Sequence, residues 1–137
     1  MITSSSVPSR SELTLAALLG DTDSMRNVRE LTAAVAPTTL PVLILGPTGV
    51  GKELVARAVH ALSGRPGSLV CFNAAAVSDS MFEATMFGHV RGAFTGAVSD
   101  HPGYLAEADR GSLFLDEVAS MGTGVQSKLL RAIETGE

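Results

Sequence analysis

The sequence predicts an α/β fold of three layers, in which a parallel sheet is covered by helices on both faces. Short apolar runs that are typical of buried strands alternate with segments whose apolar residues recur at helical spacing. The chain of 137 residues is long enough for one such domain. A hydrophobic content of 45% with only 4% aromatics predicts a core of Leu, Val, Ala and Ile.

The expected elements follow one another in the order that a parallel sheet requires. Residues 1–12 are rich in serine and lack the apolar stretch of a signal peptide, so we expect a disordered tail before a folded part at 13–137. Helices are expected at about 25–35, 53–62, 81–86 and 127–133, and strands at about 42–45, 69–72 and 113–115. Strands that alternate with helices predict parallel pairing.

A glycine-rich turn between the first strand and the following helix carries the main chemical signal. It consists of Gly46, Pro47, Thr48, Gly49, Val50, Gly51, Lys52 and Glu53. Such a turn directs backbone N–H groups and a helix N-terminus toward one point, where a polyphosphate fits and Lys52 would reach the β- and γ-phosphates. The turn therefore predicts the phosphate loop (P-loop) of a nucleoside triphosphatase (NTPase). The alternative is a glycine-rich turn with an ordinary surface lysine.

The general phosphate-loop pattern continues with Ser or Thr after the lysine, and here Glu53 takes that place, so Mg²⁺ needs another protein ligand. Asp116 and Glu117 follow the apolar third strand. Alternation at a strand end would point them to opposite sides, so we expect separate roles. Asp116 would hold Mg²⁺, directly or through water, and Glu117 would orient and polarise the attacking water. The alternative is a buried strand that ends in an exposed acidic turn.

Composition excludes several classes of protein. A net charge of −4 gives no positive field, so we expect no direct DNA binding by this chain. The single Cys71 cannot form an internal disulfide, which indicates a reducing compartment and favours a cytoplasmic protein. No segment is long and apolar enough to cross a bilayer, so no membrane association is expected.

Residues 87–97, between the second and third strands, have no clear helical or strand period. Within residues 92–97, Phe94 is the one large apolar side chain, and the other residues are Gly, Ala and Thr. One interpretation is a mobile loop with an apolar tip that contacts a protein partner. The other is a glycine-rich hairpin that keeps Phe94 within its own domain.

One hexapeptide within this segment resembles the GAFTGA signature of bacterial enhancer-binding proteins, the AAA+ ATPases that activate sigma-54 RNA polymerase. Its residues are Gly92, Ala93, Phe94, Thr95, Gly96 and Ala97. The stretches LLGDTDSM, VLILGPTGVGKELVARAVH, FNAAA, GSLFLDEV and QSKLLRAIETGE are similar to that family's central domain in the same order. The resemblance covers about Leu18 to Glu137 and implies the AAA+ α/β fold. The family usually carries Glu directly after the motif lysine, so the resemblance accounts for Glu53 at that position.

The resemblance implies a motor that uses ATP and Mg²⁺. A homo-oligomeric ring, expected to be a hexamer, would use ATP turnover to move the Phe94 loop. Phe94 and Thr95 would contact sigma-54, and the motion would convert the closed promoter complex to the open one. By the same resemblance, Leu19 and Gly20 match the segment near the adenine. Asn73 would switch Glu117 between poised and idle states.

The sequence also departs from the family pattern. Residues 119–125 occupy the second pore loop but lack its usual Gly-Asp and Leu-Pro pairs, and Thr85 stands where an acidic residue is common. The family's fourth strand, sensor residue and arginine fingers would come after residue 137, so we expect either a fragment or a truncated form with weak or no hydrolysis alone. In that family the fourth strand lies between the first and third.

Three functions remain open: a sigma-54 activator ATPase, a nucleotide- or sigma-binding module without hydrolysis, and an unrelated P-loop enzyme such as a small kinase.

Overall fold

The computed structural model describes residues 14–93 and 95–135. The chain divides into two compact units, Met1–Gly64 and Arg65–Glu137, and each is described by itself. The predicted tail at residues 1–12 lies outside the described residues. Within the described ranges, no helix is both long and apolar enough to cross a membrane.

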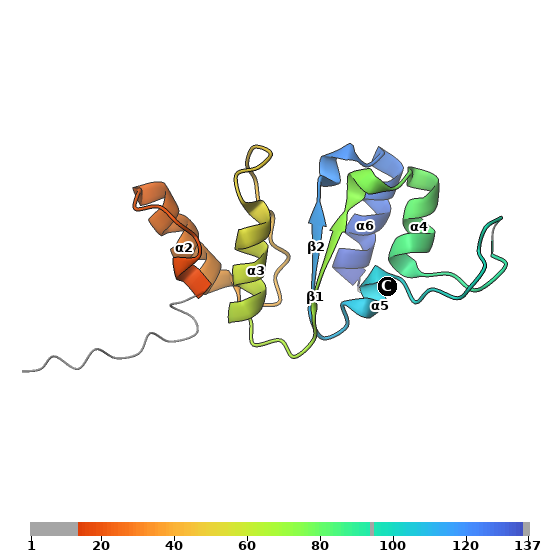
Figure 1. Cartoon of the computed structure of the whole chain (residues 1–137), viewed down its shortest axis with the longest axis horizontal. Helices are drawn as coiled ribbons and strands as arrows, with labels where there is room; N and C mark the ends of the chain where they lie inside the picture. Colours follow the sequence, from red (N-terminus) through yellow and green to blue (C-terminus); the bar gives the residue numbers. More distant parts are fainter. Residues whose placement is uncertain (1–13, 94, 136–137) are drawn as a thin grey trace, which may run out of the picture. The chain divides into compact units, whose positions relative to one another are not determined.

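In the described part of the first unit, two long helices are joined by a segment without regular secondary structure (Figure 1). A helical turn at residues 14–16 precedes α2 (Asp23–Val35). The side chain of Thr22 caps α2, because its hydroxyl accepts a hydrogen bond of 3.3 Å from a backbone N–H in the first turn. Helix α3 (Lys52–Leu62) begins directly after the phosphate loop, and Gly51 occupies its N-cap position. Both helices occur where apolar spacing predicts them.

The second unit contains a two-stranded parallel sheet with helices packed against it (Figure 1). The strands pair in parallel register from Leu69 with Ser112 to Asn73 with Asp116. The elements in chain order are β1 (Leu69–Asn73), η1 (Ala74–Ala76), α4 (Asp79–Phe87), α5 (Tyr104–Glu107), β2 (Ser112–Asp116), η2 (Val118–Ser120) and α6 (Thr123–Thr135). The predictions of β1, α4, β2 and α6 are therefore confirmed within a few residues at their ends.

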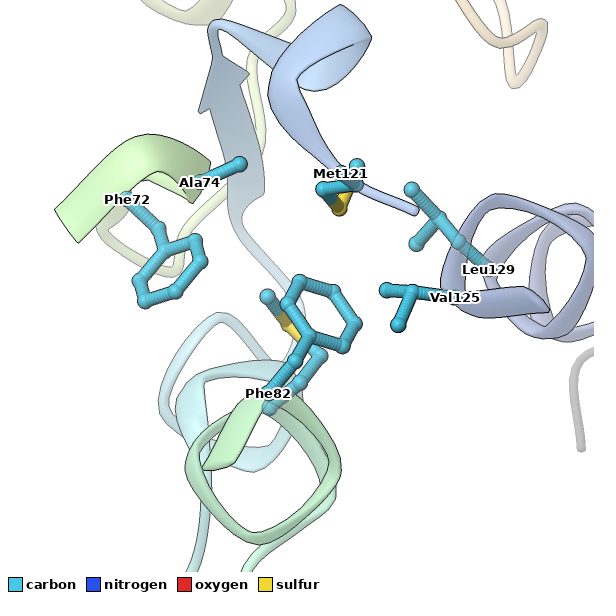
Figure 2. Packing of buried hydrophobic residues seen from close by; sticks show 7 residues of the cluster. Phe72, Ala74, Phe82, Met121, Val125 and Leu129 are labelled. Carbon is cyan, nitrogen blue, oxygen red and sulfur yellow. The ribbon is translucent and has the colours of Figure 1, made fainter. Parts of the chain in front are cut away.

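The core of the second unit lies between the strands and helices α4 and α6. Figure 2 shows the side chains that converge there from β1, α4 and α6. The rings of Phe72 and Phe82 meet edge to face, with centroids 5.9 Å apart and planes at 70°. The buried members are Phe72, Ala74, Phe82, Met86, Met121, Val125 and Leu129. The core thus joins one face of the sheet to helices α4 and α6.

The prediction of a strand at residues 42–45 is wrong. Across the described ranges, the segment pairs with no neighbouring strand and has no regular secondary structure. Leu43 is 73% exposed, although an apolar side chain in a central strand would be buried. The reason is that a strand requires hydrogen bonds from a neighbour, and apolar composition alone cannot supply them.

We predict that Phe82→Ala destabilises the second unit by about 3 to 5 kcal/mol, because it removes a ring that is only 1% exposed and leaves a cavity. Urea denaturation followed by circular dichroism is the measurement. Phe87→Ala is the matched control, since Phe87 lies on the same helix but is 41% exposed. Equal destabilisation by the two substitutions would contradict the assignment of the core.

Candidate functional site

The phosphate loop is held closed by its own lysine. The Nζ atom of Lys52 donates to the carbonyl oxygens of Gly46 and Pro47, at 3.2 and 3.0 Å. Gly51 has φ 99°, in the left-handed region that favours glycine, and caps α3 without a side-chain hydrogen bond. The turn therefore places an ammonium group beside the N-terminus of a helix, which is the arrangement that binds phosphate groups.

An open cavity of about 680 Å³ in the first unit connects the phosphate loop with residues 17–19. Val50, Gly51 and Lys52 line it from the loop, and Leu19 lines it from the segment near Gly20. Further lining comes from α2, α3 and residues 40–45. Among the described residues that line the cavity, Lys52 is the only charged one. The cavity thus combines one cationic end with apolar walls and is large enough for a nucleotide.

Arg29 holds the segment that sequence analysis placed near the adenine. Its Nη1 atom donates to the carbonyl oxygens of Leu18 and Gly20, at 2.7 and 2.8 Å. The guanidinium therefore fixes both ends of a short irregular segment that contains Leu19. Helical spacing places Arg29 on α2, but no sequence signal indicated these contacts. Arg29 is therefore a residue of this site that was not predicted from the sequence.

The carboxyl ends of β1 and β2 bring two predicted site residues together. Asn73 and Asp116 are register partners in the parallel ladder, so they lie side by side at one edge of the sheet. The Asn73 side chain accepts a hydrogen bond of 2.8 Å from the Ala75 N–H and caps η1. Oδ1 of Asp116 accepts the Glu117 N–H at 2.9 Å. This edge belongs to the second unit, whereas Lys52 belongs to the first.

Glu117 does not continue strand β2. Its backbone has φ 54° and ψ 37°, a left-handed conformation that is uncommon for a residue other than glycine. Both the N–H and the hydroxyl of Ser120 donate to the Glu117 carbonyl, at 2.9 and 2.7 Å, and stabilise this turn. The expected alternation of Asp116 and Glu117 is therefore wrong, because alternation requires an extended backbone at both residues. The exposed Glu117 side chain leaves the sheet at a turn instead.

Asp116 is the residue at this edge that the sequence predicts as a Mg²⁺ ligand. Within the described residues, no group of three or more His, Cys, Asp and Glu side chains is arranged to hold a metal ion. Mg²⁺ in nucleotide sites usually takes one or two carboxylates and completes its shell with phosphate oxygens and water. Oδ2 of Asp116 accepts no hydrogen bond from the described residues, so this carboxylate fits that role. Glu117, the next residue, is exposed.

The segment that carries the GAFTGA sequence has hydrogen-bonded arms. His89 and His101 form an antiparallel bridge with two N–H to O bonds of 2.9 Å. Further out, the Arg91 N–H donates to Oδ1 of Asp100 at 2.7 Å. The arms therefore close as in the hairpin interpretation. Phe94, which was predicted to form the tip, lies outside the described residues.

The other predicted contact residues of this segment fall within the described ranges. The Gly92 N–H donates to the Ala97 carbonyl at 2.9 Å, which closes the segment near its end. Ala97 is buried, whereas Ala93, Thr95 and Gly96 are exposed. The exposed members lie between the hydrogen-bonded arms, where a partner could reach them.

A contact that was not predicted joins α4 to the start of α6. Oδ1 of Asp79 accepts the Gly122 N–H at 3.2 Å, and Lys128 of α6 forms an ion pair with Glu83 of α4. The acidic residue at the start of α4 is a sequence signal for a helix N-terminus. Its partner, 43 positions further along the chain, could not be inferred from that signal.

The chain is an α/β protein of the P-loop NTPase class. Helices alternate with strands along the second unit, and a phosphate loop precedes α3. The family described as Sigma-54 interaction domain matches residues 18–137. The chain therefore belongs to the sigma-54 interaction domain family, the AAA+ class of transcriptional activators.

Similar proteins include transcription regulators from two bacteria. The anaerobic nitric oxide reductase transcription regulator NorR of Vibrio vulnificus (strain YJ016) is 49% identical over 121 residues, covering 88% of this chain and 24% of that protein. The Psp operon transcriptional activator of Escherichia coli (strain K12) is 48% identical over 121 residues, covering 88% of this chain and 37% of that protein. The chain thus spans only a minor part of the length of these relatives.

Solved structures agree on the fold. A crystal structure of NtrX from Brucella abortus superposes with a TM-score of 0.73 at 40% identity, over 88% of this chain and 26% of that chain. NtrX in complex with ATP gives a TM-score of 0.72 at 41% identity, over 84% of this chain and 24% of NtrX. The predicted AAA+ α/β fold is confirmed.

Proposed function

We propose that this chain is the nucleotide-binding part of an AAA+ motor that couples ATP hydrolysis to remodelling of sigma-54 RNA polymerase during transcription activation. The observation that carries the proposal is the cavity of about 680 Å³, whose only charged lining residue among those described is the phosphate-loop lysine, Lys52. Membership of the sigma-54 interaction domain family supports it. So does the similarity to NtrX, which was crystallised in complex with ATP.

We assign separate roles in ATP binding and hydrolysis to four residues. The Lys52 ammonium and the N–H groups at the start of α3 bind and orient the phosphates. Asp116 would hold Mg²⁺, and the ion would supply positive charge that stabilises the phosphate oxygens. Glu117 orients the attacking water and accepts its proton. Asn73, beside Asp116 in the ladder, would switch Glu117 between poised and idle states.

The partner of the motor is sigma-54 RNA polymerase, and Phe94 and Thr95 would make the contact. The His89–His101 bridge and the bond from the Arg91 N–H to Asp100 join the two arms that lead to this contact. Hydrolysis would take place in a homo-oligomeric ring, a hexamer, of the complete protein in the cytoplasm. Direct DNA binding by this chain is not part of the proposal, because its net charge is −4.

Lys52→Ala should weaken binding of Mg-ATP at least about tenfold, or about 1.4 kcal/mol, since it removes a charge-assisted contact to the phosphates. Isothermal titration calorimetry on the chain measures this. Lys128→Ala is the control, because that lysine pairs with Glu83 and does not line the cavity. Unchanged ATP affinity in Lys52→Ala would overturn the assignment of the phosphate loop.

Glu117→Gln in the complete, assembled protein should retain ATP binding and lose about a hundredfold or more in turnover, because an amide is a far weaker base than a carboxylate. Phosphate release under saturating ATP is the measurement. Glu134→Gln, on the exposed face of α6, should hydrolyse ATP normally. Full turnover by Glu117→Gln would mean that another residue orients the water.

Phe94→Ala in the complete protein should keep ATP binding but abolish capture of sigma-54 and promoter opening. The ring is the main apolar group of the segment, and truncation of such an anchor costs about 2 to 4 kcal/mol. A pull-down with sigma-54 in the presence of a transition-state analogue, paired with a promoter-opening assay, tests this. Val98→Ala is the control, because that side chain is 81% exposed in the same segment. Normal promoter opening by Phe94→Ala would leave the fold assignment intact and remove the proposed mechanism.

The same assays separate the two alternative functions. A binding module would bind ATP with Lys52-dependent affinity but release no phosphate even as a complete, assembled protein. A small kinase would transfer phosphate to an acceptor and would tolerate Phe94→Ala. The motor alone requires Lys52, Glu117 and Phe94 together.

A further inference from the structure

We propose that Arg29 is a positioning residue that shapes the nucleobase end of the cavity. The inference rests on the proposed nucleotide-binding function and adds the residue that holds the segment at residues 18–20 in place. Nη1 of Arg29 bridges the carbonyl oxygens of Leu18 and Gly20, at 2.7 and 2.8 Å. A guanidinium has several donors in a fixed plane, so it can hold two acceptors in one geometry.

The segment that Arg29 bridges depends on this contact for its shape. Residues 19–21 lie outside helices and strands, so no backbone ladder fixes their conformation. Gly20 has φ 118°, and a Cβ atom there would lie 3.0 Å from Cγ of Met25. The chain therefore turns tightly against α2. Fixing the carbonyls on both sides of Leu19 fixes the direction in which that residue faces.

The fixed segment forms one wall of the cavity. Leu18 and Leu19 both line it, as do Gly51 and Lys52. A nucleotide whose phosphates lie at Lys52 must place its base against the apolar lining, because the charged end is already taken. Leu19 is 82% exposed although it is apolar and its backbone is held, so a flat base that covers it removes apolar surface from water. Arg29 acts on the base only through this wall, since it is not among the lining residues.

The test compares two ligands that share a triphosphate but differ in the base. ATP and inorganic tripolyphosphate are titrated, each with Mg²⁺, into the wild-type chain and into Arg29→Leu. The expected result is about tenfold weaker ATP binding, with tripolyphosphate affinity changed by no more than about twofold. Lys52→Ala should weaken both ligands, because it acts on the phosphates. Arg29→Lys should give intermediate ATP affinity, since an ammonium can donate but cannot hold two carbonyls in a fixed plane.

Arg26→Leu is the matched control on the same helix. Arg26 forms an ion pair of 2.5 Å with Asp23 on the exposed surface, whereas the carbonyls of Leu18 and Gly20 accept from Arg29. It should bind both ligands as the wild-type chain does. If Arg29→Leu does not fold, as judged by circular dichroism, Arg29→Lys carries the comparison.

Three outcomes would overturn the inference. Equal weakening of ATP and tripolyphosphate by the Arg29 variants would show a general effect on the fold. Unchanged affinity for both ligands would show that the base lies elsewhere in the cavity. Failure of the wild-type chain to bind either ligand would instead overturn the proposed nucleotide-binding function, and the inference would fall with it.

Discussion

The parallel ladder between β1 and β2 is the interaction on which the second unit depends. It pairs Leu69–Asn73 with Ser112–Asp116 residue by residue, so it satisfies backbone groups that would otherwise be unpaired in the interior. The same pairing presents Phe72 to the helices that complete the core. It also brings Asn73 beside Asp116 at the carboxyl edge. The ladder therefore positions both the core and the candidate site of this unit.

Two positive φ angles show how the chain leaves regular structure at its candidate sites. At Gly51 the left-handed conformation is favourable, because glycine has no Cβ atom. At Glu117 the same region costs about 1 to 2 kcal/mol for an L-residue. Hydrogen bonds from Ser120 to the Glu117 carbonyl, and from the Glu117 N–H to Asp116, offset that cost. A strained backbone that its surroundings hold in place is often found at functional sites, which agrees with the role proposed for Glu117.

The first unit shows the opposite situation, in which a segment with strand composition has no partner. Residues 42–45 are apolar, but none of the described residues pairs with their backbone, and they line the open cavity instead. Helix α2 and the phosphate loop line other parts of that cavity. Its shape therefore depends on contacts such as that of Arg29 with Leu18 and Gly20, rather than on a sheet.

The sequence by itself determined those elements whose stability is local or strongly periodic. Helical spacing predicted α2, α3, α4 and α6, the glycine pattern predicted the phosphate loop, and two apolar runs predicted β1 and β2. Helix α5 is only four residues long, too short to show a period. Tertiary structure decided the register of Asn73 with Asp116, the left-handed turn at Glu117 and the reach of Arg29 to Leu18. Each of these depends on hydrogen bonds or backbone geometry that composition and spacing do not specify. The predicted strand at 42–45 fails for the same reason, because its apolar composition does not supply a hydrogen-bonding neighbour.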